Sequence, residues 1–325
     1  MKKIEVIGHR GARSFAPENT LPGYKLALEC GIDYIDADVV VTKDEVLIAY
    51  HDLALNSDIL IDINGKRPNY PQVEGEPNKF NPTGLIKDID FEYLNLHYRV
   101  ELNPKSSYAK FFPNQFQLSY LKIPTLQEVV DYTNQITNSK INFQFEIKND
   151  LDNPNLSYSY DKLATLVYEF IDRNDLFERV KIQAFDWRIL VKLTSWDNRI
   201  KTAFLEDNQG NSFKHFFNDP QMVELAQKSV GITANNSVFE VIKAFGGYSY
   251  EPEDVTLTKE QIEASHKLGI KVLVWRYPEH SGSTFDEALV NRLIDDGIDG
   301  FIIDDPMRMN KLLESKGYHT PKKYE

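Results

Sequence analysis

Short apolar segments alternate along the chain with longer stretches in which apolar residues recur every three or four positions. The short segments predict strands and the longer stretches predict helices. Strands are expected at 4–8, 34–41, 46–50, 141–148, 180–185, 200–205, 230–233, 271–275 and 300–303. Helices are expected at 21–30, from 125, at 161–173, from 187, and at 221–228, 258–268, 285–295 and 307–315.

Regular alternation of strands and helices predicts a parallel sheet. Eight strand–helix steps, with one additional hairpin strand, predict a TIM-type (β/α)8 barrel that forms a single domain over residues 1–325. An open, doubly wound sheet is the alternative, and it is less favoured because no Gly-rich dinucleotide-binding turn follows the first strand. Residues 53–122 interrupt the rhythm and are rich in Asn, Pro, Tyr and Asp. We interpret them as a small insertion subdomain over the barrel mouth, either a substrate lid or decoration.

The composition narrows the class of partner. The chain has 37 basic and 49 acidic residues, and its net charge of −12 argues against binding to nucleic acid or anionic membranes. The single cysteine, Cys30, excludes an internal disulfide and a thiolate zinc cluster. No segment reaches the roughly 20 apolar residues that span a bilayer, and no apolar signal core follows Met1-Lys2-Lys3. We therefore expect a cytoplasmic protein, or an exported one whose signal peptide has been removed, that acts on a small molecule.

Two histidines each follow a predicted strand. His9 and His51 should therefore both reach the carboxyl-terminal rim of the barrel, where TIM-barrel enzymes carry their active sites. An imidazole with a pKa of about 6.5 can accept or give a proton near neutral pH. Two imidazoles that flank a phosphorus atom would form an acid–base pair. Asp52 is a candidate for orienting His51.

Charged side chains also share faces of two expected strands. Asp36 and Asp38 are two positions apart, as are Glu146 and Lys148, so each pair points to one side of its strand. Charges on otherwise apolar strands are costly unless they are paired or bound to a metal. The three carboxylates would suit one hard cation, Ca²⁺ or Mg²⁺.

Positive charge for a phosphate is available at the same rim. Arg10 offers a planar fork of donors and Lys148 a point charge, so both are candidates for binding a phosphate. Glu18 is expected to brace Arg10. An acidic protein with a phosphate-bearing substrate needs such local positive charge.

In their order along the chain, these motifs resemble those of the glycerophosphodiester phosphodiesterases. The resemblance rests on His9-Arg10-Gly11, Pro17-Glu18-Asn19-Thr20, the acidic pair at 36 and 38, Thr42-Lys43-Asp44, His51-Asp52, the segments 124–128 and 146–148, Val274-Trp275 and the segment 299–304. It implies a TIM-like barrel that hydrolyses glycerophosphodiesters to sn-glycerol 3-phosphate and an alcohol. It further implies that His9 and His51 form the acid–base pair and that Asp36, Asp38 and Glu146 bind the metal. It also implies that Arg10 and Lys148 bind the phosphate. Trp275 would then form a wall against the glycerol.

Three positions depart from the pattern that we expect for this family. Asp36 stands where Glu is usual, which brings the metal site into question. Glu45 stands where Gly is usual. Arg276-Tyr277-Pro278 replaces the usual run after the tryptophan, and Arg276 would add a charge at the mouth.

Two other functions remain open. One is a lysophospholipase D-like or phospholipase C-like hydrolase of lipid phosphodiesters. The aromatic side chains of the insertion leave that possibility, namely Phe80, Phe91, Tyr93, Tyr98, Phe111, Phe112 and Phe116. The other is a relative that binds phosphodiesters without cleaving them.

Overall fold

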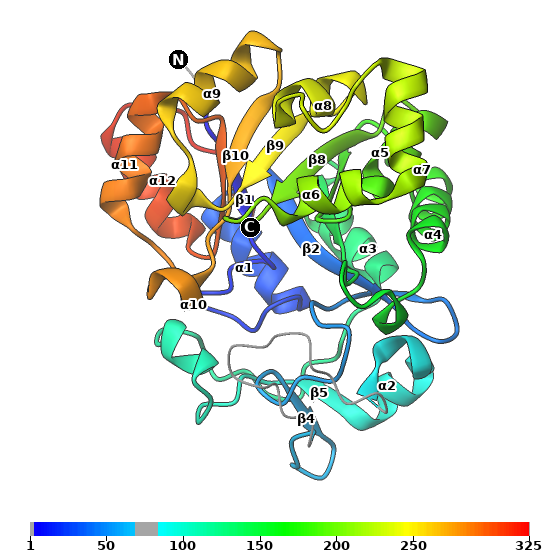
Figure 1. Ribbon diagram of the computed structural model, residues 1–325. Coiled ribbons are helices and arrows are strands. Elements are labelled where there is room, and N and C mark those ends of the chain that lie inside the picture. The colour runs from blue at the N-terminus through cyan, green and yellow to red at the C-terminus, as the bar shows by residue number, and fades with distance from the viewer. Residues whose placement is uncertain (1–2, 69–83, 325) are drawn as a thin grey trace.

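Eight parallel strands form a closed barrel in the computed structural model, which describes residues 3–68 and 84–324 (Figure 1). Strand β1 pairs with both β11 and β2, and this double pairing closes the sheet. The predicted TIM-type barrel is therefore confirmed. Its strands are β1 (Glu5–Gly8), β2 (Tyr34–Val41), β6 (Asn142–Ile147), β7 (Val180–Ala184), β8 (Lys201–Glu206), β9 (Ser249–Pro252), β10 (Lys271–Val274) and β11 (Gly300–Ile303).

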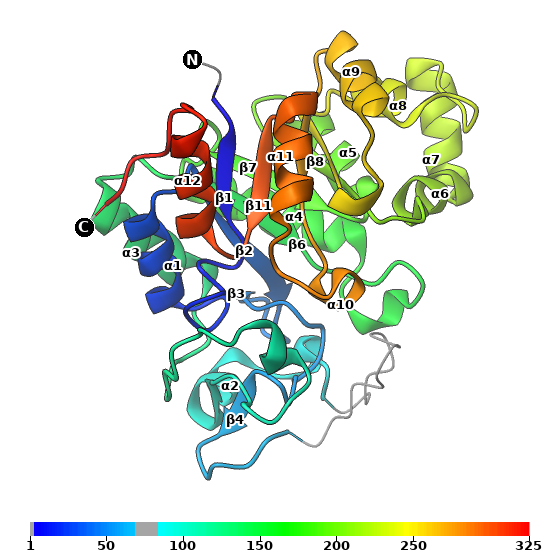
Figure 2. The same ribbon diagram turned by 90° about the vertical axis from the view of Figure 1, so that its left-hand side faces the viewer.

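Helices surround the barrel on its outside (Figures 1 and 2). Side-chain caps fix where several begin: Thr20 caps α1, and Thr125 forms a capping box with Glu128 at the start of α3. The helices are α1 (Leu21–Cys30), α3 (Leu126–Thr137), α4 (Tyr160–Arg173), α5 (Trp187–Trp196), α6 (Asn211–Asn218), α7 (Pro220–Leu225), α8 (Val238–Ala244), α9 (Lys259–Lys267), α10 (Pro278–Ser281), α11 (Glu287–Asp296) and α12 (Pro306–Ser315). Short turns of helix add η4 (Pro154–Leu156), η5 (Ala226–Val230) and η6 (Asp254–Thr256).

One expected strand is wrong. Residues 230–233 do not enter the sheet: Val230 ends η5, and Gly231 leaves that helix in the left-handed conformation, at φ 69°. The sixth barrel strand is instead β9, Ser249–Pro252. Its sequence contains a serine, a glutamate and a proline, which are unusual in a buried strand. They fit here because Ser249 and Glu251 face a polar barrel interior.

That interior holds a group of side chains that we call the polar layer: Gln144, Lys181, Gln183, Ser249 and Glu251, all almost fully buried. Lys181 Nζ lies 2.9 Å from Glu251 Oε1, and Ser249 Oγ donates to the same oxygen at 2.9 Å. Gln144 Nε2 donates to Gln183 Oε1 at 2.8 Å. A buried charge is tolerated only when it is paired in this way.

The insertion gathers at one end of the barrel (Figures 1 and 2). It follows β3 (Leu47–Ala49), a hairpin strand antiparallel to β2. Its described elements are β4 (Leu60–Asp62), η2 (Ile86–Asp88), α2 (Phe91–His97), β5 (Tyr98–Val100) and η3 (Tyr108–Phe111), with β4 and β5 paired. Leu55, Leu60, Ile86, Leu94 and Val100 belong to a small apolar core shared with β2 and β3. Phe80, one of the aromatic residues considered above, lies outside the described residues.

Candidate active site

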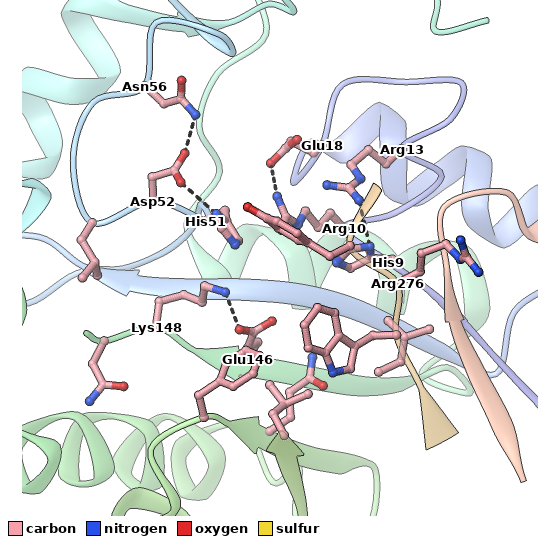
Figure 3. A pocket seen from close by; sticks show the side chains of 18 of the residues that line it. His9, Arg10, Arg13, Glu18, His51, Asp52, Asn56, Glu146, Lys148 and Arg276 are labelled. Atoms are coloured by element: carbon pink, nitrogen blue, oxygen red, sulfur yellow. Dashed lines mark hydrogen bonds and ion pairs between the residues drawn. The ribbon is translucent and has the colours of Figure 1, made fainter. Parts of the chain in front are cut away.

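A cavity of about 280 Å³ is lined both by residues that follow barrel strands and by residues of the insertion. Most of the residues expected to carry the chemistry line it, together with side chains from the insertion (Figure 3). The lining includes His9, Arg10, Arg13, Glu18, His51, Asp52, Asn56, Tyr108, Glu146, Lys148, Gln183, Trp275 and Arg276. His51 and His9 lie on opposite sides of the cavity, left and right in Figure 3, with Arg10 between them and Lys148 and Glu146 below them in that view.

His9 follows β1 and is held by a residue from the other end of the chain. Its Nδ1 lies 2.8 Å from Asp304 Oδ1, just after β11, and 3.3 Å from Arg13 Nη2. Because the contact with Asp304 is the shorter, we assign the proton to Nδ1, which then donates to Asp304. The Nε2 atom is left with a lone pair that can accept a proton.

The charge on His9 is set by its surroundings. Burial, and next the positive charge of Arg13, lower the pKa of His9 to about 4, against the opposing effect of Asp304. Burial alone would raise the pKa of Asp304, but Arg13 and His9 hold it below its ordinary value. The pair is therefore a neutral imidazole beside an ionised carboxylate at neutral pH.

His51 is arranged in a similar way on the opposite side. Its Nδ1 lies 2.9 Å from Asp52 Oδ1, and Asn56 Nδ2 donates to Asp52 Oδ2 at 2.7 Å. Burial opposes ionisation of Asp52, but His51 and these hydrogen bonds lower its pKa. Asp52 is thus an ionised carboxylate in contact with the His51 ring, which is the geometry that the predicted orienting role requires.

Arg10 lies on the same loop as His9 and is braced by two carboxylates. Its Nη1 donates to Glu18 Oε1 at 2.7 Å, and its Nε lies 3.1 Å from Asp38 Oδ2. The loop turns sharply at Gly11, whose φ is 94° and where a Cβ would come within 2.8 Å of the Gly23 backbone. The expected bracing of Arg10 by Glu18 is present.

Lys148 sits among acidic groups rather than apart from them. Residues 38 and 146 are register partners on β2 and β6. Lys148 Nζ makes a short ion pair with Glu146 and lies 3.5 Å from Asp38 Oδ1. A cationic group therefore already lies between two of the three carboxylates that were expected to bind a metal.

Asp36 lies deeper in the barrel than the residues that line the cavity. Like Asp38, it is fully buried, and neither aspartate is among the described residues that line the cavity. Gln183 Nε2 donates to its Oδ1 at 2.6 Å, so Asp36 borders the polar layer beneath the cavity. Burial, and then Asp38 and Glu146, raise the pKa of Asp36, whereas Arg10 and Lys148 lower that of Asp38 despite its burial.

The donor set fits a cation only in part. Within residues 3–68 and 84–324, no three His, Cys, Asp or Glu side chains are close enough together to hold a metal ion as they stand. Yet Asp36 Oδ2 and Asp38 Oδ1 are buried without a hydrogen bond, and only Asp38 Oδ1 has a charged neighbour, Lys148 Nζ at 3.5 Å. Such oxygens are the ligands that Ca²⁺ and Mg²⁺ prefer.

The two residues that directly follow β10 also border the cavity. Trp275 stands edge-on to Phe185, with ring centroids 5.5 Å apart, and its Nε1 donates to the Glu251 carbonyl. The side chain of Arg276 points away from Lys148 and Glu146 (Figure 3). Its Nε donates to Asp254 Oδ2 at 2.8 Å. Its charge is therefore paired rather than presented to the cavity.

Three residues of the site were missed from the sequence. Asp304 ends a motif that pointed to the family, but no role could be read from it because its partner His9 lies 295 positions away. Arg13 is four residues after His9, and no alternation of strand positions marks it. Tyr108 belongs to the insertion and has no sequence signal of its own.

Comparison with known proteins supports the same family. A model of the glycerophosphoryl diester phosphodiesterase family matches residues 9–308. The chain is 24% identical over 315 residues to a glycerophosphodiester phosphodiesterase of Caldanaerobacter subterraneus, covering 97% of this chain and 100% of that one. It is 23% identical over 320 residues to one of Bacillus subtilis, covering 97% and 88%.

Solved structures show the same fold. A Silicibacter pomeroyi protein proposed to be a glycerophosphoryl diester phosphodiesterase has a TM-score of 0.78 at 23% identity, covering 98% of this chain and 95% of that one. A phosphodiesterase of Oleispira antarctica, in complex with the product sn-glycerol-3-phosphate, has a TM-score of 0.62 at 18% identity, covering 95% and 96%. In the described part of this chain, no helix is long and apolar enough to cross a membrane.

Proposed function

The chain belongs to the glycerophosphoryl diester phosphodiesterase family and is a phosphoric diester hydrolase, and we propose that it cleaves glycerophosphodiesters to sn-glycerol 3-phosphate and an alcohol. One observation carries the proposed mechanism: two histidines face one cavity from opposite sides, and each has a carboxylate behind it. Acid–base groups on both sides of a phosphorus atom are what an in-line displacement requires.

His9 is the proposed general base. Its Nδ1–H donates to Asp304, and its Nε2 accepts the proton of the attacking oxygen. The lowered pKa of His9, about 4, keeps the ring neutral and able to accept a proton at neutral pH. The attacker is either water or the neighbouring glycerol hydroxyl. In the second case the attack would form a cyclic phosphate, which water would then open.

His51 is the proposed general acid. It protonates the oxygen of the leaving alcohol, and Asp52 stabilises the imidazolium before the transfer. Arg10 and Lys148 are proposed to bind the phosphate oxygens. Because their positive charges are already fixed in place, they would stabilise the negative charge that builds up on the phosphate in the transition state. Trp275 is the proposed wall against the glycerol.

We also propose that Asp36, Asp38 and Glu146 bind one divalent cation, Ca²⁺ or Mg²⁺. The buried oxygens of Asp36 and Asp38 that accept no hydrogen bond support this. When bound, the cation would neutralise charge on the phosphate. The Asp36 carboxylate is one methylene, roughly 1.5 Å, shorter in reach than the glutamate that we expect in the family.

A small head group fits the cavity better than a lipid. The space bounded by the described residues is about 280 Å³, close to the lower end of the roughly 300–1,000 Å³ typical of small-molecule sites. A lysophospholipid would need an apolar channel in addition. We therefore place water-soluble glycerophosphodiesters ahead of lipid phosphodiesters as substrates.

The decisive experiment uses metal-stripped protein. Ca²⁺ or Mg²⁺ is added back, and release of sn-glycerol 3-phosphate from glycerophosphocholine is followed with a coupled assay. We expect turnover that depends on the added cation. Choline release from lysophosphatidylcholine, measured in parallel, should be much slower; the reverse order would favour the lipid hydrolase. Binding of glycerophosphocholine without turnover under every cation would favour a non-catalytic relative.

A further inference from the structure

One stretch of the insertion, residues 108–116, lies against the loop that carries His9 and Arg10. Gln115 Nε2 donates to the Arg13 carbonyl at 2.8 Å, and the Phe116 amide donates to the Phe15 carbonyl at 2.8 Å. The Arg13 guanidinium lies 4.8 Å from the centre of the buried Phe112 ring. The insertion is therefore bound to the catalytic loop by backbone and side-chain contacts, beyond simple proximity to the cavity.

The Tyr108 hydroxyl is the point where this stretch reaches the cavity. It makes a short hydrogen bond to Glu18 Oε2, and its oxygen accepts from Arg13 Nη1 at 2.9 Å. Burial raises the pKa of Tyr108 well above its ordinary value, so the hydroxyl keeps the proton that it donates. Tyr108 also lines the cavity.

The two partners of this hydroxyl each support a residue of the proposed mechanism. Glu18 holds Arg10 through its other carboxylate oxygen at 2.7 Å. Arg13 holds both oxygens of Asp304, at 2.8 and 2.9 Å, and Asp304 orients His9. One phenol thus connects the phosphate-binding arginine with the carboxylate behind the proposed base.

We propose that Tyr108, supplied by the insertion, is a positioning residue for the phosphate site: its hydroxyl fixes Glu18 and Arg13, and through them Arg10 and the His9–Asp304 pair. The insertion is then a structural part of the active site rather than decoration. The proposal rests on the proposed function only in naming the anion as phosphate. Tyr108 acts through its neighbours and takes no proton from the substrate.

The test is Tyr108→Phe, which removes the hydroxyl and keeps the ring against Phe112. We expect the inhibition constant for inorganic phosphate to rise about tenfold and kcat/KM to fall at least as far, because hydrogen bonds to charged groups are lost. The melting temperature should stay near that of the wild type. Tyr120→Phe is the matched control, since Tyr120 is an insertion tyrosine that is 79% exposed, and it should change neither constant.

A double-mutant cycle identifies the route. If Tyr108 acts on Arg10 through Glu18, then Tyr108→Phe should weaken phosphate binding far less in a Glu18→Gln background than in the wild type. Additive effects, or a normal phosphate affinity in Tyr108→Phe, would overturn the proposal, as would a lower melting temperature with unchanged kinetics.

Calorimetric titration with inorganic phosphate keeps this comparison independent of turnover. A wild-type protein that binds phosphate but cleaves no glycerophosphodiester would overturn the proposed function. The role of Tyr108 would still be decided by whether its variant loses phosphate affinity.

Discussion

Asp38 on β2 lies directly beside Glu146 on β6 in the register of the barrel sheet. Two neighbouring carboxylates repel each other, and here Lys148 Nζ contacts both. The arrangement brings a cation to the acidic pair without a metal. It also means that a divalent ion would have to share the pair with an ammonium group that is itself expected to hold the phosphate.

This relationship gives a prediction for cation binding. Asp38→Asn removes the central carboxylate, and we expect the affinity for Ca²⁺ or Mg²⁺ to fall by at least about 10–100-fold, the range seen even for outer-shell changes. Isothermal titration calorimetry measures this without any turnover. Asp131→Asn, on the exposed side of α3, is the control. Equal affinities in both variants would show that the cation, if any, binds elsewhere.

The two histidines should be separately essential. His9→Ala and His51→Ala should each lower kcat by about 10²–10⁴-fold, the usual contribution of a general acid or base. Circular dichroism should show that both variants remain folded. His319→Ala, exposed near the carboxyl terminus, should retain wild-type turnover. Near-normal activity in both of the first two variants would remove the acid–base assignment.

The pH dependence should report on His9. Its lowered pKa, about 4, places the loss of the neutral base well below neutrality. As the pH falls through 4, His9 takes up a proton, so kcat/KM should decrease and form an acid limb in the pH profile. Above that range, the titration of His9 should leave kcat/KM unchanged. Asp304 raises the pKa of His9, so Asp304→Asn should move the limb to lower pH, and it should also lower kcat by loosening the ring.

The measurement is kcat/KM from pH 3.5 to 7, with the folded fraction followed by circular dichroism at each pH. A limb that Asp304→Asn leaves in place would argue that a different group accepts the proton.

The buried ion pair of the polar layer should matter for stability. Lys181 and Glu251 are both fully buried, so Lys181→Met leaves an uncompensated charge in the barrel centre. We expect the free energy of unfolding to drop by about 3–5 kcal/mol. Lys162→Met, which removes a surface pair with Glu45, should cost about 1 kcal/mol or less. Urea denaturation of the two variants tests the contrast, and similar losses would contradict it.

Much of the fold follows from local patterns. The bounds of α1, β2 and β11 agree with those expected, because apolar periodicity, the Thr20 cap and the glycine after α1 all act within a few residues. β9 was missed because its sequence suits a polar interior. That environment is created by Lys181, which is 70 positions before Glu251.

In the site, too, the residues set by local sequence could be predicted, whereas those set by distant partners could not. His9, Arg10, His51 and Lys148 could be located because each follows or ends a strand. Asp304 and Tyr108 gain their roles only through partners 295 and 90 positions away, His9 and Glu18. Glu45, where glycine was expected, adopts a left-handed φ of 62°. This conformation costs backbone energy for a residue with a Cβ atom.

The polar layer has one more consequence, for the choice of substrate. Gln183 belongs to this layer and also lines the cavity, so the layer forms the floor of the binding site. This floor consists of paired charges and amides. A longer ligand could enter it only by displacing these side chains, which would break the buried pair of Lys181 and Glu251. We therefore expect any extension of the substrate to point away from this floor, toward the side of the cavity that insertion residues such as Tyr108 help to line. Variation in head-group length among homologues would then be accommodated by changes in the insertion, while the barrel interior stays the same.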